Sequence, residues 1–225
     1  MLGLALAGSA SAETYWLDYE GDALPESCGW TRIWNQPFAE RSIQDGVFVL
    51  DASADRHTCD WYEHYTDNGC AWPMPDAEVP DPCSHFFMQW RLKIEDFIGS
   101  PSAATVGVFT PDSWAVGFLI TDQTIRSAFE QDVSASFEPN EFHEFELRST
   151  NMRTYELYMD GSPALTGYFY DAVMTNKIVW GEDTTTGSSV SRWDYFRVGI
   201  APEPCSSLAV IVLMAAASLA RRTRG

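Results

Sequence analysis

Short stretches in which apolar and polar residues alternate fill most of the chain between residues 13 and 200. Gly, Pro, Asp, Asn and Ser separate these stretches, and aromatic and β-branched residues are frequent within them. Since a period of two places successive side chains on opposite faces of a strand, the pattern predicts β-strands. The predicted strands are Trp16–Tyr19, Gly46–Asp51, Phe86–Ile94, Ala104–Phe109, Ala115–Ile120, Phe142–Arg148, Thr154–Met159, Leu165–Tyr170, Lys177–Trp180 and Arg192–Val198.

One turn between two of these strands has a specific signature. Asp160-Gly161 lies between YELYM and SPALTGYFY, and Asp-Gly between alternating segments is the strongest short hairpin signal. No stretch outside the two ends has helical periodicity for more than a turn or two. The sequence therefore predicts an all-β domain in which two antiparallel sheets pack face to face as a jelly-roll sandwich.

Charge and composition narrow the class of protein. The 225 residues include 32 Asp and Glu against 14 Lys and Arg, a formal net charge of −18. Such a surface repels phosphate backbones, so we expect no nucleic-acid partner. With 45% hydrophobic and 14% aromatic residues, the chain is too apolar to be a disordered acidic tail, and its length suits one folded domain.

The two ends of the chain read as export signals. Residues 1–12, MLGLALAGSASA, end in the small-x-small pattern Ala10-Ser11-Ala12 and predict a signal peptide. Because the apolar core is short, the alternatives are a signal whose true start lies upstream and a plain disordered N-terminus. Ser206–Ala220 carries no charge, and a helix of that length spans about 22 Å against roughly 30 Å of hydrocarbon. It is interpreted as a marginal transmembrane helix with its arginines in the cytoplasm, and a buried C-terminal helix is the alternative.

The C-terminal order of motifs resembles a known sorting tail. Pro202-Glu203-Pro204, the apolar run and the basic residues Arg221, Arg222 and Arg224 follow one another within residues 201–225. This arrangement is similar to the PEP-CTERM tail of envelope-bearing bacteria. The resemblance implies transient recognition by an exosortase, a membrane-anchored precursor, and delivery of the protein to the cell surface or the extracellular matrix.

Four cysteines agree with an oxidising compartment. Cys28, Cys59, Cys70 and Cys83 lie in the first half of the body and permit three pairings. We favour Cys70 with Cys83, which closes a proline-rich loop, and Cys28 with Cys59. A zinc site is the rival interpretation, but no close C-x-x-C pair is present.

The strands themselves resemble concanavalin A-like, or laminin G-like, lectin and glucanase domains. The resemblance rests on FHEFELRSTNMRTYELYMDGSPALTG, VWGEDTTTGSSVSRWDYFRV, the opening YWLDYEGDALPESCGW and the central FFMQWRLKI. It spans most of residues 13–200 and implies a concanavalin A-like sandwich. It also implies a possible structural calcium between Glu20 and Asp194, with a salt bridge between the terminal strands as the alternative.

Catalytic motifs are missing from this sequence. The Glu-x-Asp-x-x-Glu cluster of laminarinase-type enzymes does not occur, and Glu130-Gln131-Asp132 lacks the second glutamate at the right spacing. Glu144 and Glu146 alternate with His143, Phe145 and Leu147, which predicts a solvated face opposite a core face. His57, His64, His85 and His143 form no H-x-H or H-x-x-x-H pair, so we expect no metal site among them.

Aromatic residues favour binding over catalysis. Nine Trp, nine Tyr and thirteen Phe exceed the needs of a sandwich core. Trp114, Tyr168, Tyr170 and Trp180 are the candidates to face a polysaccharide, although for each of them taken singly a core position is the favoured interpretation. The preferred hypothesis is an exported, non-catalytic surface or matrix protein that binds polysaccharide. The alternatives are a glycan-active hydrolase or lyase and a purely structural envelope protein.

Overall fold

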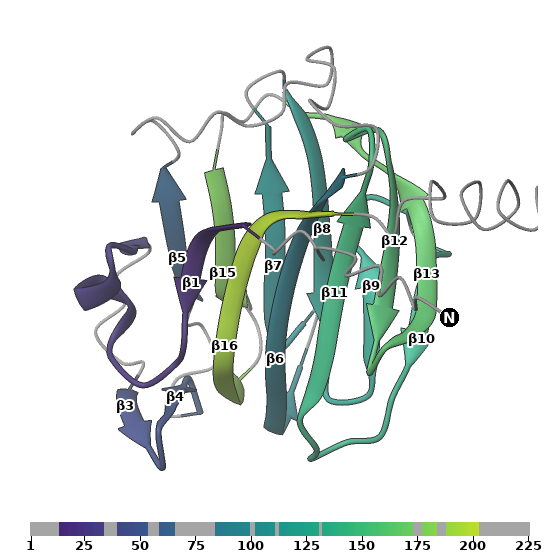
Figure 1. Cartoon of the computed structure of the whole chain (residues 1–225). Helices are drawn as coiled ribbons and strands as arrows, with labels where there is room; N and C mark the ends of the chain where they lie inside the picture. The colour runs from purple at the N-terminus through teal and green to yellow at the C-terminus, as the bar shows by residue number, and fades with distance from the viewer. Residues whose placement is uncertain are drawn as a thin grey trace, which may run out of the picture.

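The structure is a computed structural model that describes residues 14–33, 40–53, 59–65, 84–99, 102–110, 113–130, 132–172, 177–183 and 188–202. These residues form two antiparallel sheets that pack face to face (Figure 1). One short 3-10 helix, η1 (Pro25–Cys28), follows the first strand. The predicted all-β sandwich is confirmed.

The first sheet contains the long central strands and both ends of the described chain. Its two 15-residue strands, β6 and β16, pair along almost their whole length. The order across the sheet is β13 (Ser162–Tyr168), β12 (Thr154–Met159), β11 (His143–Ser149), β6 (Ser84–Ile98), β16 (Ser188–Pro202), β4 (Val47–Asp51) and β3 (Glu40–Gln44), and β1 (Thr14–Tyr19) also pairs with β16.

The second sheet lies behind the first in Figure 1 and is built around β7, β8 and β15. Its order is β10 (Ser134–Ser136), β9 (Thr124–Ser127), β8 (Trp114–Ile120), β7 (Ala104–Phe109), β15 (Lys177–Asp183), β5 (Cys59–Tyr65) and β2 (Thr31–Ile33), and β14 (Tyr170–Asp171) also pairs with β8.

The core follows from the alternation that predicted the strands. On β6, Phe86, Met88 and Trp90 are buried between the sheets, whereas Gln89 and Arg91 on the other face are half-buried. Aromatic rings dominate this core, and the rings of Trp90 and Phe145 stack with centroids 5.4 Å apart. Aromatic pairs of this kind add specific geometry to the burial of apolar area.

The predicted Asp-Gly hairpin joins β12 and β13. Asp160 and Gly161 have φ angles of 50° and 73°, which is the positive-φ pair that a type I′ turn requires. The Asp160 carboxylate accepts the Glu144 N–H at 2.9 Å and lies 2.7 Å from His143 Nδ1. The expected core-side position of His143 is confirmed, since only 8% of the residue is exposed.

The export signals lie almost entirely outside the described residues. Residues 1–12 and the sorting tail from Glu203 onward, including the predicted helix 206–220, are not described. The last strand continues through Pro202, whose backbone pairs with Ser84, so the first proline of the motif belongs to the sheet. Within the described ranges, no helix is both long enough and apolar enough to cross a bilayer.

The predicted Cys28–Cys59 bridge is not formed in this structure, where Cys28 is an exposed free thiol. The register explains this, because Thr31 pairs with Glu63 and the strands run antiparallel. Cys28 therefore lies toward the Tyr65 end of β5, whereas Cys59 begins that strand. A disulfide needs Cα atoms within about 7 Å, and four residues of strand alone span about 13 Å. Cys70 and Cys83 lie outside the described residues.

Candidate functional site

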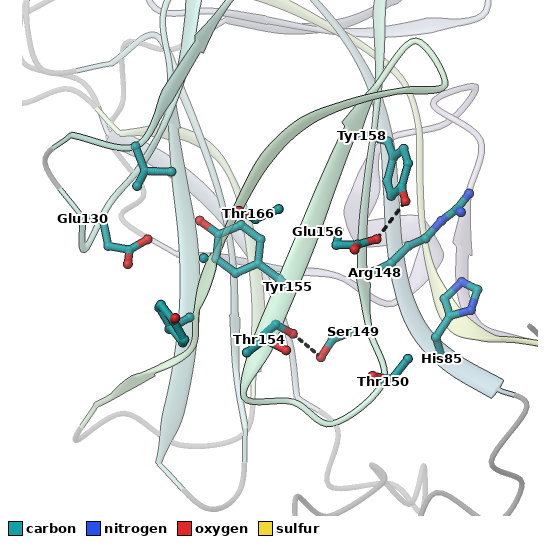
Figure 2. Close-up of a pocket in the computed structure, with 13 residues that line it drawn as sticks. His85, Glu130, Arg148, Ser149, Thr150, Thr154, Tyr155, Glu156, Tyr158 and Thr166 are labelled. Atoms are coloured by element: carbon teal, nitrogen blue, oxygen red, sulfur yellow. Dashed lines mark hydrogen bonds between the residues drawn. The ribbon is translucent and has the colours of Figure 1, made fainter.

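An open cavity of about 690 Å³ lies at the β13 edge of the first sheet. Strands β11, β12 and β13, the loop between β9 and β10, and the start of β6 supply its walls (Figure 2). Apart from His85, Val133 and Gly167, its lining consists of tyrosines, charged groups and hydroxyls; the most prominent are Glu130, Arg148, Tyr155, Glu156, Tyr158 and Tyr168.

The lining comes from both faces of the β12–β13 hairpin. Tyr155 pairs with Gly167, and the buried Tyr155 ring faces the core. Glu156 pairs with Thr166, and both are exposed on the opposite face. Figure 2 shows the same division, with Glu130 and Tyr155 on one side of the hairpin and Glu156, Tyr158 and Arg148 on the other.

The outer side of the cavity is a connected polar network. Arg148 donates to Glu146 through Nε at 2.6 Å and through its terminal nitrogen at 2.8 Å. Its guanidinium lies over the Tyr158 ring, 4.4 Å from the centroid, and the Tyr158 hydroxyl donates to Glu156 at 2.8 Å. The hydrogen bonds with Glu146 raise the pKa of Arg148. Paired and stacked in this way, the side chains form a pre-ordered wall.

The Glu130 carboxylate on the inner side of the cavity interacts with two phenols, those of Tyr155 and Tyr170. Ser127 Oγ accepts the N–H groups of Phe129 at 3.2 Å and Glu130 at 3.1 Å, which fixes the loop that carries Glu130. Burial raises the pKa of Tyr155 to about 12, with Ser127 opposing the rise. A hydrogen bond with Glu130 raises the pKa of Tyr170 to about 12. Both phenols therefore remain neutral at physiological pH and can act as donors.

Three of the four predicted ligand-binding aromatics gather near this edge. Tyr168 is 62% exposed and lines the cavity. Tyr170 lies two residues further on, and its ring stacks on that of Phe129 with centroids 5.4 Å apart. Trp114 pairs with Asp171 of β14, but the Arg153 guanidinium covers its ring at 4.1 Å from the centroid. Tyr168 is thus the aromatic side chain most available to a ligand.

The expectation that Trp180 faces a ligand is wrong. Trp180 is fully buried between the sheets, and its ring centroid lies 4.7 Å from that of Trp193 and 5.7 Å from that of Phe196. The physical reason is the alternation on β15, where Ile178 and Trp180 share the inner face. A period-two pattern shows that alternate residues face opposite ways without saying which set points inward.

The two residues proposed for calcium are each paired with arginine. The end of β1 does approach β16, since a Cβ on Gly21 would lie 2.5 Å from the carbonyl oxygen of Asp194. Arg197 forms ion pairs with both Asp18 and Glu20, and Arg91 forms one with Asp194. Among the described residues, no three His, Cys, Asp or Glu side chains are grouped so that they could hold a metal ion.

The carboxylates of the cavity do not form a glycosidase pair. Hydrolysis of a glycosidic bond requires two carboxyl groups that flank the same bond. Glu130 lies against Gly167 and Tyr155 on the inner side, whereas Glu156 lies on the outer face of the hairpin. On β11, the predicted alternation of Glu144 and Glu146 with buried Phe145 and Leu147 is confirmed.

Sequence reasoning missed most of the residues that line the cavity. In the sequence Glu130 is a candidate only for a glucanase carboxylate, and Tyr155 and Tyr158 lie within the predicted strand Thr154–Met159 without a motif of their own. One signal was present, because Gly167 interrupts a strand, and glycine there often marks a site where another group approaches the backbone closely.

Comparisons with known proteins support the fold. No family model and no curated protein matches the sequence. A solved carbohydrate esterase from the Shiga toxin-encoding bacteriophage phi24B superposes with a TM-score of 0.59 at 13% identity, over 85% of this chain and 100% of that one. A Bacillus subtilis protein of unknown function with a galectin-like fold superposes with a TM-score of 0.51 at 10% identity, over 85% of this chain and 99% of that one. A sialidase gives 0.50 at 16% identity, over 87% of this chain and 19% of that one.

Proposed function

We propose that this protein is a non-catalytic polysaccharide-binding protein that holds its ligand in the cavity at the β13 edge. The observation that carries the proposal is an open cavity of about 690 Å³ with an exposed tyrosine at its margin and hydroxyls and charged groups on its walls. Sugar rings have apolar faces that pack on aromatic rings, and their hydroxyls need both donors and acceptors.

The lining meets these two requirements. Tyr168 offers an aromatic surface, and Thr154 and Thr166 on the same face are exposed hydroxyls. The wall of Arg148 and Tyr158 is already hydrogen-bonded, so little side-chain freedom would be lost on binding. Similarity in fold to a carbohydrate esterase and a sialidase agrees with this class of ligand.

The proposal includes export of the protein, on the basis of the two ends of its sequence. The leader at residues 1–12 and the tail at residues 201–225 are those of a protein that an exosortase would transfer to the cell surface or an exopolysaccharide matrix. An acidic ectodomain suits that location, because net charge keeps a protein soluble and limits association with like-charged polymers. Mass spectrometry of the mature C-terminus tests this part, and an intact Arg224 on surface-displayed protein would contradict it.

Binding is tested by isothermal titration of the full-length chain with neutral and acidic hexasaccharides, alongside an assay for released reducing ends. We expect saturable binding of at least one hexasaccharide, no release of reducing ends, and at least tenfold weaker binding by Tyr168→Ala. Tyr15→Ala, which alters an aromatic ring 39% exposed on β1, is the matched control. Equal affinity of Tyr168→Ala and wild type would reject the cavity as the site.

A further inference from the structure

The positive charge of the cavity comes from one side chain on its outer side. Arg148 is the one arginine or lysine among the described residues that line the cavity. It pairs with Glu156 across β11 and β12, and Glu156 pairs with Thr166 across β12 and β13. Directly opposed side chains share a face of the sheet, and the exposed Tyr168 follows two residues after Thr166 on that face. A sugar packed on Tyr168 therefore lies on the same face as the Arg148 guanidinium.

Glu146, which is not part of the cavity lining, holds this guanidinium. Arg148 donates through Nε to one Glu146 carboxylate oxygen at 2.6 Å and through a terminal nitrogen to the other at 2.8 Å. The Tyr158 ring packs on the guanidinium, 4.4 Å from its centroid. The Glu146 side chain is 13% exposed, against 40% for that of Arg148, so water screens this pair less than a fully exposed one. Two of the three guanidinium nitrogens are thus occupied, and the charge of Arg148 is largely cancelled.

Two carboxylates also line the cavity, and their hydrogen bonds leave them charged. Glu156 accepts the Tyr158 hydroxyl at 2.8 Å, and a hydrogen bond joins Glu130 to the Tyr170 hydroxyl. Phenols are neutral donors, so neither bond cancels the negative charge of its acceptor. A uronic acid, sulfate or phosphate group in the cavity would meet like charges. A neutral sugar would meet only donors and acceptors for its hydroxyls.

We propose that Glu146 makes the cavity select neutral over acidic glycans by keeping the Arg148 guanidinium from the ligand. This inference rests on the proposed function, because it specifies the ligand class of the same cavity. An acidic ligand gains a full ion pair with Arg148 only by displacing Glu146, and a carboxylate bound through two hydrogen bonds resists displacement. Glu146 is therefore a positioning residue, which acts through Arg148 without touching the ligand.

The test compares the affinities of full-length variants for neutral hexasaccharides of glucose, xylose and mannose and for hexagalacturonate. Wild type should bind at least one neutral probe at least tenfold more tightly than hexagalacturonate. Glu146→Gln keeps the shape of the side chain and removes its charge. It should raise the affinity for hexagalacturonate at least fivefold and change the affinity for the neutral probe less than twofold. Glu146→Ala should reproduce the gain, and adding Arg148→Gln to Glu146→Gln should abolish it.

Glu144→Gln is the matched control. Glu144 lies two residues before Glu146 on the same face of β11, accepts the Tyr195 hydroxyl and is not among the residues that line the cavity. The substitution changes the net charge of the protein by the same amount as Glu146→Gln. It should alter the affinity for hexagalacturonate less than twofold, and thermal midpoints identify any variant that fails to fold.

The outcomes separate this inference from the proposed function. Equal gains from Glu146→Gln and Glu144→Gln would reject the role of Glu146, because net charge alone would explain them. A gain that persists after Arg148→Gln would reject it as well. In both cases the proposed function stands if Tyr168→Ala weakens neutral binding. Binding of hexagalacturonate to wild type as tight as that of the best neutral probe rejects the inference alone. If wild type binds none of the probes, both proposals fall.

Discussion

Replacing Tyr155 by phenylalanine should leave the protein at least as stable as wild type at neutral pH. Tyr155 is buried, its ring packs against Phe118 at 5.4 Å between centroids, and its hydroxyl makes no hydrogen bond of ordinary geometry with the described residues. The substitution keeps the packed ring and removes a polar atom that is buried without compensation. Removing such an atom is neutral or stabilising by about 1 kcal/mol.

The same substitution should change stability strongly at alkaline pH. The folded state raises the pKa of the Tyr155 phenol to about 12, against 10.0 in the unfolded chain. Between these values the unfolded chain loses a proton that the folded chain keeps, so wild-type stability falls as pH rises. Two pKa units correspond to about 2.7 kcal/mol. This contribution of the neutral Tyr155 phenol to wild-type stability is fully present below pH 10 and is lost by about pH 12.

Urea denaturation followed by tryptophan fluorescence, from pH 7 to pH 12, measures this difference. Relative to wild type, the free energy of unfolding of the variant should rise by about 2 to 3 kcal/mol between pH 9 and pH 12. Below pH 9 the difference between the two proteins should be constant. Other groups that titrate in this window are common to both proteins and cancel. If the variant's free energy of unfolding at pH 7 is lower than that of wild type by more than about 1 kcal/mol, the hydroxyl has a hydrogen-bond partner. A difference in the free energy of unfolding that does not change with pH would contradict a raised pKa for the Tyr155 phenol.

Three further substitutions test other parts of the structure. Asp160→Ala should lower the free energy of unfolding by about 1 to 3 kcal/mol, because the His143 ring and the Glu144 N–H lose their acceptor; Asp160→Asn keeps an acceptor, and equal losses in urea denaturation would contradict this. Trp180→Ala should lower the free energy of unfolding by about 3 to 5 kcal/mol through the cavity that it leaves. A fall no larger than that caused by Trp114→Ala in the same assay would contradict the buried position of Trp180. Glu20→Gln should cost less than about 1 kcal/mol, since its pair with Arg197 is solvent-exposed; a larger fall in thermal midpoint that calcium chelation reproduces in wild type would favour the metal site.

The sequence predicted the strands better than it predicted their faces. Alternation located both partners of the β12–β13 hairpin, and Asp160-Gly161 predicted the turn. Trp180 and Tyr168 lie in equally regular alternating segments, yet one is fully buried and the other is 62% exposed. The inward face is decided by how the two sheets pack, which depends on contacts between strands distant in sequence.

The approach of Glu130 to the β12–β13 hairpin could not be predicted for the same reason. Glu130 belongs to the loop after β9 in the second sheet, whereas Tyr155 and Gly167 belong to the first. No spacing along the chain connects them, because the closing of one sheet over the other brings them together. Only Gly167 carried a local signal, and that signal indicates a close approach without identifying what approaches.

The properties of β13 as an edge strand explain why this border can hold a ligand. An unpaired edge normally invites another strand to add to the sheet. Here Pro163 removes one backbone donor, and the register shift between Leu157 and Tyr158 interrupts the regular ladder beside it. Both features oppose strand addition. The Asp-Gly turn fixes the register of the hairpin and thereby sets Gly167 opposite Tyr155, so the features that protect the edge from aggregation also hold this wall of the cavity in place.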